Sequence, residues 1–359
     1  MPQPEDRPVR ATLADVAKLA GVSKATVSYT YSRPARVSEP TRAKVMAAAK
    51  RLGFQGPSAV GRMLVSGRTR VIAIVTAMLV DTTNDDRFSL SVLEGLLREL
   101  APLGYGSLVL SPATSPGTES LLGTLAFDGA VAIQRRSHHH ETDQIILGRG
   151  VPLLRLDGNA EDDRAYVLQE DHAVAQIIEK LRDDGHERIA TATLFFDSDH
   201  RRSALRSPGD IPDAKPAPVR ARLAGFARAG IVPSHIYECA YVQYAEGYKA
   251  GLALLSLPDR PTAIVCQADV LAAGVIGAAR ELDLAVPGDV SVTGFDALPG
   301  PDMESLNLTT VHQSGLERGR AAARWIVGVV EGHSPPPAVI EATVRWGATT
   351  GPAPATSTS

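Results

Sequence analysis

A short basic and hydroxyl-bearing segment near the start of the chain carries side chains suited to binding a nucleic acid. Lys24, Ala25, Ser28 and Tyr29 fall within six residues, at a spacing that puts them on one face of a helix. An exposed helix with these side chains can reach phosphate oxygens and base edges in a DNA major groove. The spacing therefore predicts a helix that contacts DNA. The alternative is an ordinary solvated helical face.

Two predicted helices joined by a sharp turn would position this face. Thr12 can cap the first helix, with Asp15 three residues later as its partner in a capping box. Gly21 can adopt the left-handed conformation that ends a helix, so a second helix can begin at Ser23. The apolar positions expected to face inward are Val16, Leu19, Ala20, Val22 and Val27.

A third helix is predicted between Ser38 and Gly53. Ser38 is a suitable N-cap, Pro40 falls in the first turn, and Gly53 can end the helix. Its expected apolar face consists of Val45, Ala48, Ala49 and Leu52. Three short helices of this kind are typical of a helix-turn-helix domain.

The charge of the chain divides between two parts. Residues 1–66 hold 11 of the 37 Lys and Arg and 4 of the 40 Asp and Glu, a balance of +7. The remaining residues hold 26 and 36, a balance of −10. A basic head neutralises phosphates, whereas an acidic body does not cling to DNA by itself. This division favours a DNA-binding head on a separate body.

The head resembles the DNA-binding domain of the LacI/GalR family of bacterial transcription regulators, whose opening pattern residues 12–54 follow closely. The resemblance implies that Lys24 and Ala25 read bases. Tyr29 replaces a common arginine and Ser32 a common asparagine, which should change the preferred operator. The DNA contacts that the resemblance implies are Thr12, Leu13, Ser23, Lys24, Ala25, Thr26, Ser28, Tyr29, Ser32, Arg36, Ser38 and Leu64.

Residues 56–70 are similar to the hinge of that family. In the family this segment folds into a short helix on the operator, beside the hinge of a partner chain, and inserts a leucine into the minor groove. Leu64 matches that leucine. Such a helix is too short to persist alone, so its formation can depend on DNA. The alternative is a plain linker rich in Gly, Pro and Ser that makes no groove contact.

Beyond residue 70 the expected strands and helices alternate as in a parallel α/β sheet. Strands are expected at 71–75, 106–110, 129–133, 151–156, 188–195, 236–242, 261–267 and 290–295, and helices at 88–100, 172–183, 219–229, 245–255, 269–281 and 315–331. Two such units match the family's core, which resembles periplasmic sugar-binding proteins. The resemblance also implies that the chain crosses between two lobes near 166–171, 295–298 and 309–313.

The predicted fold class is therefore α/β, with an N-terminal helix-turn-helix head of three helices and a two-lobed periplasmic-binding-protein-like core. The 359 residues suffice for both parts. The expected boundaries are a disordered N-terminus over 1–10, the head over 11–55, the hinge over 56–70, the effector-binding and dimerisation core over 71–350, and a disordered tail over 351–359.

Two motifs in the body match the family's ligand cleft. Residues 220–226 (RARLAGF) resemble a family helix, in which Arg222 falls on the arginine that grips ligand hydroxyls or carboxylates. Residues 289–296 (DVSVTGFD) resemble the strand whose last residue, here Asp296, enters the cleft. The structural alternative is that Arg222 merely pairs with a carboxylate.

Three further effector contacts rest on the resemblance. Asp269 follows a strand that usually ends in Asn-Asp, although Ala268 replaces the asparagine here. Phe88 matches an aromatic wall of the pocket, and Asp171 matches a crossover position that can line it. Gln313 matches the third crossover, where a hinge role is expected. Alternatively, Asp269 caps the helix after its strand and Phe88 belongs to the core.

Other segments carry no expected chemistry. Three adjacent histidines in residues 138–141 (HHHE) cannot all face one metal ion, so this stretch is expected to be a solvated loop. Residues 197–218 form a longer connection than is usual in the family and are expected to be a mobile loop or a lid beside the cleft. Cys239 and Cys266 lie far apart with no metal-ligand spacing. No metal or cofactor is expected.

The sequence predicts a DNA-binding transcription regulator. By resemblance it is a homodimeric repressor whose affinity for double-stranded operator DNA is controlled by a small polar effector, a sugar or sugar derivative. An activator or dual regulator has the same architecture and stays open. An α/β enzyme is a remote alternative, because no nucleophile elbow, P-loop or dinucleotide fingerprint occurs. The absence of a leader and of a long apolar run predicts a soluble cytoplasmic protein without a membrane partner.

Overall fold

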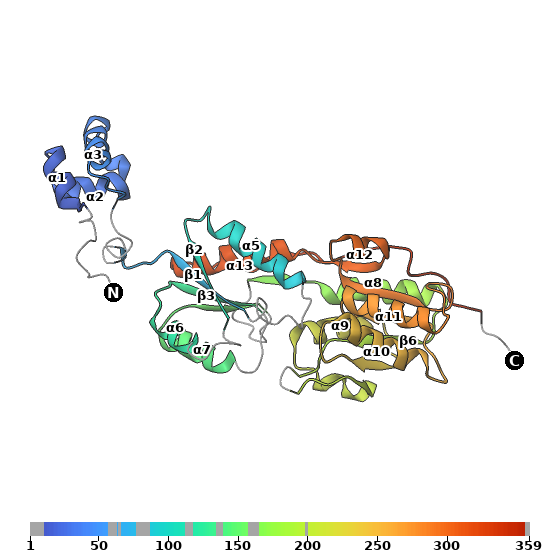
Figure 1. The fold of residues 1–359 in the computed structure, drawn as a ribbon. Helices are drawn as coiled ribbons and strands as arrows, with labels where there is room; N and C mark the ends of the chain where they lie inside the picture. Colours follow the sequence, from blue (N-terminus) through green and yellow to red (C-terminus); the bar gives the residue numbers. More distant parts are fainter. Residues whose placement is uncertain are drawn as a thin grey trace, which may run out of the picture. The chain divides into compact units, whose positions relative to one another are not determined.

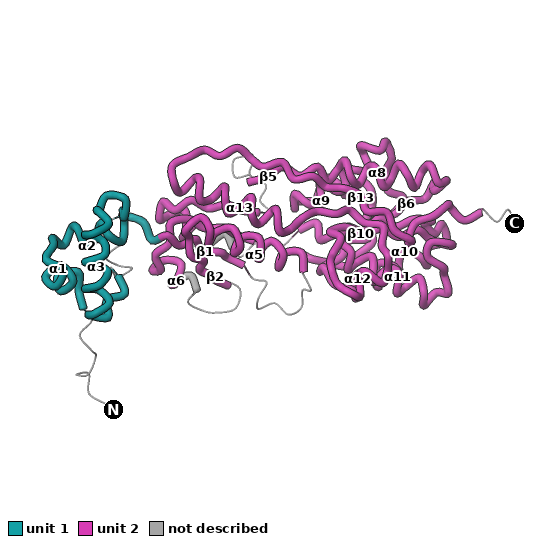
Figure 2. The backbone as a smooth tube through the Cα atoms, turned by 90° about the horizontal axis from the view of Figure 1, so that it is seen from above, with its two compact units in different colours: residues 1–69 teal, residues 70–359 magenta. Residues whose placement is uncertain are grey.

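A computed structural model describes residues 11–56, 63, 66–76, 87–111, 118–133, 139–156, 165–197 and 200–355. The chain divides into two compact units, Met1–Thr69 and Arg70–Ser359, and each has its own core (Figure 2). The predicted N-terminal segment 1–10 and Leu64 lie outside the described residues.

Helices α1 (Leu13–Ala20), α2 (Lys24–Ser32) and α3 (Glu39–Arg51) and the 3-10 turn η1 (Pro34–Arg36) form the first unit. Thr12 caps α1 in a capping box, and its backbone N–H donates to the Asp15 carboxylate over 2.8 Å. Gly21 ends α1 with a φ of 66°, and Ser23 accepts the Thr26 N–H at the start of α2. The predicted start and end of α1 and the predicted start of α2 are therefore confirmed.

One closed core holds the three helices of the head together. Its buried residues are Val16, Ala17, Val27, Val45, Ala48 and Ala49. Two residues predicted for this core lie outside it, since Leu19 is 41% exposed and Leu52 is 37% exposed. Leu52 follows the last residue of α3, at its C-cap. The inward face of α1 centres on Val16 and Ala17, which leaves Leu19 at its edge.

The first lobe of the second unit is a parallel sheet with helices on both faces. Its strands, in the order β2-β1-β3-β4, are β1 (Val71–Thr76), β2 (Gly106–Leu110), β3 (Gly129–Ile133) and β4 (Leu153–Arg155). Helices α5 (Arg87–Leu100) and α13 (Gly315–Val330) cover one face, and α6 (Thr118–Thr124) and α7 (His139–Gly148) cover the other (Figure 1). The predicted strands are confirmed to within a few residues.

Two glycines allow α5 and α13 to pack with their backbones in contact. A Cβ atom added at Gly95 would lie 2.2 Å from the carbonyl oxygen of Leu316, and one added at Gly319 would lie 2.1 Å from that of Val92. No side chain larger than hydrogen fits at either position. In the first lobe, α13 from the C-terminal part of the chain therefore packs directly on α5.

The second lobe contains a mixed sheet of seven strands. In the order β13-β11-β10-β9-β6-β8-β7, these are β13 (Thr343–Arg345), β11 (Thr309–His312), β10 (Ser291–Asp296), β9 (Ala263–Cys266), β6 (Ile189–Thr193), β8 (Ile236–Glu238) and β7 (Ala204–Arg206). The two edge strands are antiparallel to their neighbours and the inner strands are parallel. Helices α8 (Glu170–Asp183) and α9 (Ala217–Arg228) pack on one face, and α10 (Tyr244–Leu255) and α11 (Asp269–Glu281) on the other.

Three strand-to-element connections carry the chain between the lobes. Strands β5 (Tyr166–Leu168) and β12 (Ala338–Ile340) pair with each other and pack against the core of the first lobe. The chain crosses between the lobes from β5 to α8, from β11 to α13 and from β12 to β13. The predicted crossing near 295–298 is wrong, because β10 and β11 are neighbours in one sheet and are joined within the second lobe by α12 (Pro301–Ser305). The third crossing is at 340–343 instead.

Two segments predicted to lack regular structure are ordered. Gly351 donates its N–H to Ser291 and Ala353 to the Asp184 carbonyl, so the predicted disordered tail over 351–359 begins too early. His139 begins α7, so the loop predicted over 138–141 is wrong for residues 139–141. Within the described part of the chain, no group of three or more His, Cys, Asp or Glu could hold a metal ion.

Asp269 joins three elements of the second lobe. It is the first residue of α11 and is 1% exposed. Its carboxylate accepts the Leu298 N–H over 2.7 Å and the Thr310 hydroxyl over 2.5 Å, so both oxygens are occupied. Burial raises the pKa of Asp269 to about 6, although these hydrogen bonds oppose the change. The carboxylate is thus a buried joint between α11, β11 and the loop after β10.

We predict that Gly319→Ala lowers the free energy of unfolding by about 3 kcal/mol, because the new methyl group meets the Val92 backbone. Urea denaturation of the full chain measures this. Gly123→Ala is the control, since its Cβ would meet nothing within 4 Å. Equal stability of the two variants would contradict the close packing of α5 and α13.

A second prediction concerns pH. Because the pKa of Asp269 is higher in the folded chain, about 6 against an ordinary 3.8, the folded state holds the proton more tightly. This contribution is complete below the lower value and is lost as the pH rises through the higher one. Between about pH 4 and pH 7, the wild type should therefore lose about 3 kcal/mol relative to Asp269→Asn.

Urea denaturation at several pH values measures this difference. Asp302→Asn, which removes a carboxylate that is 82% exposed, is the control and should follow the wild type. Parallel stability curves for the wild type and Asp269→Asn would refute the expected titration.

Candidate functional sites

The outer face of α2 carries the side chains predicted to contact DNA. Lys24 and Ala25 are exposed, and Tyr29 is 42% exposed. Val27 and Thr30, on the opposite side, are buried. Because the inner face is closed by the head core, Lys24, Ala25 and Tyr29 lie on the outer face.

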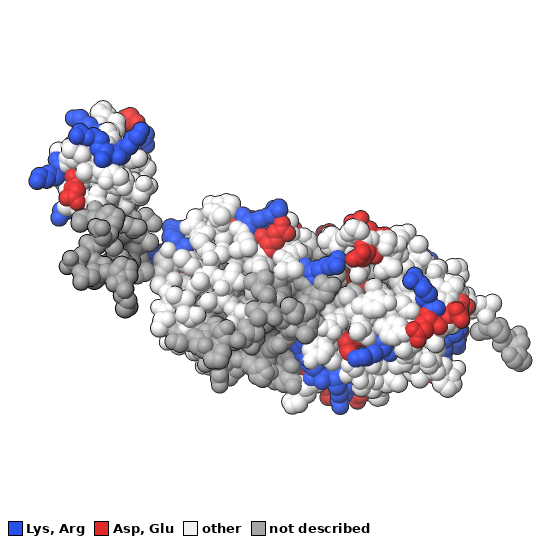
Figure 3. Space-filling view, in the orientation of Figure 1, with Lys and Arg blue, Asp and Glu red and all other residues white. Residues whose placement is uncertain are grey.

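The head is basic, and its two described acids are already engaged. Residues 11–56 contain eight Lys and Arg and two Asp and Glu, and Figure 3 shows several of the basic side chains on the surface of this unit. Glu39 pairs with Arg42 at 2.8 Å. Hydrogen bonds from the Thr12 side chain and backbone hold the pKa of Asp15 below its usual value. Most of the positive charge of the head is therefore available to phosphates.

The remaining predicted DNA contacts differ in their surroundings. Ser32 and Arg36 are exposed, whereas Leu13 is half-buried and packs against the head core. Ser38 precedes α3, as predicted, but makes no side-chain bond to the helix backbone; its hydroxyl lies 2.9 Å from that of Thr41. The structure therefore gives Leu13 a packing contact in place of a fully exposed position.

Arg222 is the centre of a buried polar cluster in the second lobe. Its Nε lies 3.3 Å from the Glu170 carboxylate on α8, and its Nη2 lies 4.0 Å from the Asp296 carboxylate at the end of β10. Nη1 donates to the Gln267 carbonyl, and the guanidinium stacks 3.6 Å above the Phe295 ring. The arginine is 6% exposed. Two carboxylates thus compensate one buried cation.

Asp296 stands where the backbone leaves the sheet. It has a φ of 106° and the following Ala297 has a φ of 50°, which are both in the left-handed half of conformational space. Its carboxylate accepts a hydrogen bond of 2.6 Å from Gln313. Two such residues in succession are a strained connection that the surrounding contacts must hold.

A continuous row of hydrogen bonds leads from this cluster to the first lobe. Gln313 follows β11 and accepts from Arg318 of α13 over 3.0 Å. Arg318 in turn donates to the Tyr166 hydroxyl over 2.8 Å, and its guanidinium lies 5.1 Å from the ring centre of Phe88. Gln313 and Arg318 are both buried. The row thus passes through two of the crossings and connects the lobes.

The structure brings some predicted effector residues together and separates others. Arg222 and Asp296 are adjacent, and Phe88 lies against Arg318 at the other end of the row. Asp171 points elsewhere: its carboxylate lies 3.4 Å from Arg228 on the surface. Asp269 is a buried joint with both oxygens occupied. Asp269 therefore has a structural role within the described residues, and an effector contact by Asp171 stays a prediction.

Glu170 and Arg318 were missed by the sequence reasoning. Glu170 precedes Asp171 directly, and the rotation of about 100° per residue in a helix turns Glu170 inward and Asp171 outward. Its Oε1 is buried and has no hydrogen-bond partner in the described part of the chain. A buried oxygen of this kind can accept a hydrogen bond from a ligand. The apolar residues of α8 at 173, 174, 177 and 178 could have predicted which carboxylate faces the sheet.

The described residues beside Arg222 leave only a small cavity. A cavity of 10 Å³ next to Arg222, lined by Thr191, Gln267 and Phe295 among others, has room for about one water molecule. All four strands of the first lobe lead toward segments outside the described residues, namely 77–86, 112–117, 134–138 and 157–164.

No described helix is long and apolar enough to cross a membrane.

Two family models match the chain. Residues 12–56 match the model described as bacterial regulatory proteins of the lacI family, and residues 178–350 match a periplasmic binding protein-like domain. The first covers α1 to α3 with their caps. The second covers the seven-stranded sheet and α9, which carries Arg222, but only the last part of α8.

Known proteins resemble the chain over almost its whole length. The ribose operon repressor of Escherichia coli is 31% identical over 326 residues, covering 87% of this chain and 91% of that protein. An HTH-type transcriptional regulator of Mycolicibacterium smegmatis is 29% identical over 374 residues, covering 98% of this chain and all of that protein.

The crystal structure of the lac repressor dimer bound to operator and the anti-inducer ONPF superposes with a TM-score of 0.73. It covers 95% of this chain and 99% of that chain at 21% identity, and so supports the fold. The chain therefore belongs to the LacI family of bacterial transcriptional regulators, in which a helix-turn-helix DNA-binding domain is joined to a periplasmic-binding-protein-like effector-binding domain.

Proposed function

We propose that the protein is a homodimeric repressor whose affinity for a near-palindromic operator is set by a small sugar-like effector bound beside Arg222. One observation carries this proposal: the buried row from Glu170 through Arg222, Asp296 and Gln313 to Arg318 joins both lobes. A ligand that contacts this row acts on the connection between the lobes.

The exposed face of α2 that carries Lys24, Ala25 and Tyr29 supports operator binding. Lys24 and Ala25 are exposed where the recognition helix would enter the major groove, and Tyr29 beside them can contact a base or a phosphate. Two heads related by a two-fold axis require mirrored half-sites. A related protein is named as a repressor and a protein of the same fold is described as a dimer on an operator, which favours these assignments. Leu64 as a minor-groove wedge rests on the family resemblance.

The buried cluster supports a ligand rich in hydroxyl groups. The Arg222 guanidinium can donate to hydroxyl oxygens, and the Glu170 and Asp296 carboxylates can accept from hydroxyl hydrogens. Glu170 Oε1 has no partner in the described structure and would gain one from such a ligand. Sugars present donors and acceptors on adjacent carbons, which suits this alternation of charge.

The position of the row supports coupling to DNA. A ligand can shift the lobe arrangement only by binding one arrangement better than another. If that preference is about 1–3 kcal/mol, operator affinity changes roughly 5- to 150-fold, and operator DNA changes effector affinity by the same factor.

Lys24→Ala should weaken binding to the specific operator by about 1–3 kcal/mol if Lys24 reads a base, and weaken binding to random DNA less. Fluorescence anisotropy with both DNAs measures this. Lys50→Ala, the same change on the exposed side of α3, is the control and should affect both DNAs alike. An equal loss on both DNAs in Lys24→Ala would instead assign Lys24 to a phosphate.

Arg222→Gln and Asp296→Asn should bind operator nearly as the wild type does but respond little to the effector, because each substitution removes a charge from the ligand cluster while keeping a polar side chain. A thermal-shift screen of sugars with the wild type identifies the effector, and titration against labelled operator then measures the response. Arg228→Gln, on the surface of the same helix, is the control. A normal response in both cluster variants would remove Arg222 and Asp296 from the site.

A further inference from the structure

The connection between β6 and α9 has regular secondary structure and a small apolar core of its own. Residues 204–206 form β7, which pairs antiparallel with β8 at the edge of the sheet. The turn η3 (Pro208–Asp213) follows, with a capping box between Ser207 and Asp210. Phe196 is buried in a small apolar core with Ala214 and Val219. The predicted mobile loop over 197–218 is therefore wrong for its described part.

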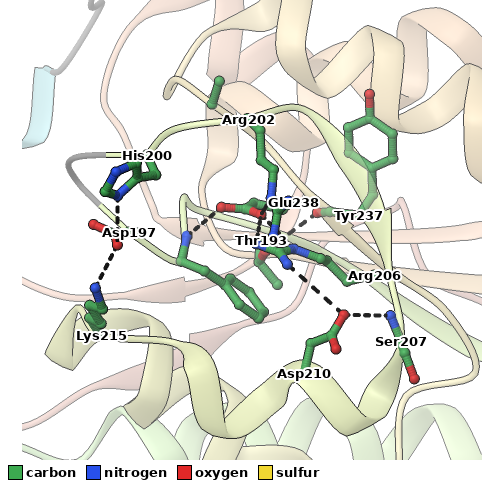
Figure 4. Close-up of polar contacts among 12 residues, drawn as sticks. Thr193, Asp197, His200, Arg202, Arg206, Ser207, Asp210, Lys215, Tyr237 and Glu238 are labelled. Carbon is green, nitrogen blue, oxygen red and sulfur yellow. Dashed lines mark hydrogen bonds and ion pairs between the residues drawn. The ribbon is translucent and has the colours of Figure 1, made fainter.

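An open pocket of 510 Å³ lies against this substructure, and Figure 4 draws several of the residues that line it. The pocket is lined by Phe196, Asp197, His200, Arg202, Arg206, Pro212, Asp213 and Lys215. It lies beyond the carboxyl ends of β6 and β8, the side on which α/β sheets bind ligands. Its volume falls within the range of small-molecule sites. None of these residues lines the cavity beside Arg222.

On one side of the pocket, Arg202 and Arg206 both lie close to the Glu238 carboxylate. Glu238 is fully buried, and it accepts the Phe196 N–H over 2.7 Å and the Arg206 Nε over 2.6 Å. Arg202 lies 3.6 Å from the same carboxylate but is 60% exposed. Arg206 also lies 4.0 Å from the Asp210 carboxylate, so two arginines serve two carboxylates, and Arg202 is the more exposed of the two cations. Its terminal nitrogens make no hydrogen bond to the described residues.

The other side has a second cluster. Asp197 accepts from Lys215 over 2.6 Å and lies 3.2 Å from Nδ1 of His200. Figure 4 shows this cluster and the Glu238 cluster as separate groups of contacts. Since Lys215 balances Asp197, a second anion could approach between His200 and Arg202.

We propose that this pocket binds the phosphate group of a small molecule, with Arg202 as its main hydrogen-bond donor. The guanidinium fork suits two phosphate oxygens at once. Three cations, Arg202, Arg206 and Lys215, stand against four carboxylates, those of Asp197, Asp210, Asp213 and Glu238, so the pocket has no excess of positive charge. The pocket therefore selects a compact anion by directed hydrogen bonds and does not attract long polyanions such as DNA.

Isothermal titration calorimetry on the full chain tests this with inorganic phosphate, glucose 6-phosphate and glucose. Both phosphates should bind, and a sugar phosphate that binds more tightly would identify an organic phosphate as the ligand. Arg202→Gln should weaken binding roughly tenfold or more, and Arg202→Lys should restore only part of it. Arg201→Gln is the matched control, since Arg201 stacks on Phe195 and Tyr241 and does not line the pocket.

Two results would overturn the proposal. One is the absence of binding by either phosphate to the wild type at about 10 mM. The other is an equal loss in Arg201→Gln and Arg202→Gln, which would show a nonspecific effect of charge. This test measures phosphate binding by Arg202→Gln, whereas the effector-site test measures the response of operator binding in Arg222→Gln, so failure of this pocket and failure of the effector site are distinguishable.

Discussion

A guanidinium that is only 6% exposed must be surrounded by acceptors, because burial removes its hydration at a cost of several kcal/mol. Arg222 meets this requirement with the Glu170 carboxylate, the Gln267 carbonyl and, at 4.0 Å, the Asp296 carboxylate. These acceptors lie on α8, after β9 and at the end of β10. The charge of one side chain thus holds three elements of the second lobe in register and forms the centre of the proposed ligand site.

The two kinds of contact in the effector-binding domain have different consequences. Backbones touch at Gly95 and Gly319, so α5 and α13 form a unit that cannot easily deform. Between the lobes, by contrast, the row through Gln313 and Arg318 consists of hydrogen bonds, which a ligand can exchange for its own. Rigid lobes and an exchangeable connection are what a ligand-controlled regulator requires.

Much of the fold could be predicted because it rests on neighbours in the sequence. The capping box of Thr12 and Asp15 and the turn at Gly21 involve residues three to nine positions apart. The strands that become β1, β3 and β9 are continuous apolar runs, as expected for strands buried on both faces. The motif around Arg222 and the strand ending at Asp296 predicted that both residues belong to one site, and their side chains lie 4.0 Å apart.

Contacts between distant segments were decided only by the tertiary structure. A rotation of about 100° separates Glu170 from Asp171, and the packing of α8 on the sheet selected the former. Asp269 became a joint because Leu298 and Thr310 arrive from other elements, and β7 exists because β8 offers a free edge. The sequence by itself determined caps, apolar runs and family motifs, since these depend on adjacent residues. Which polar side chains share a site depended on long-range packing, which no local pattern encodes.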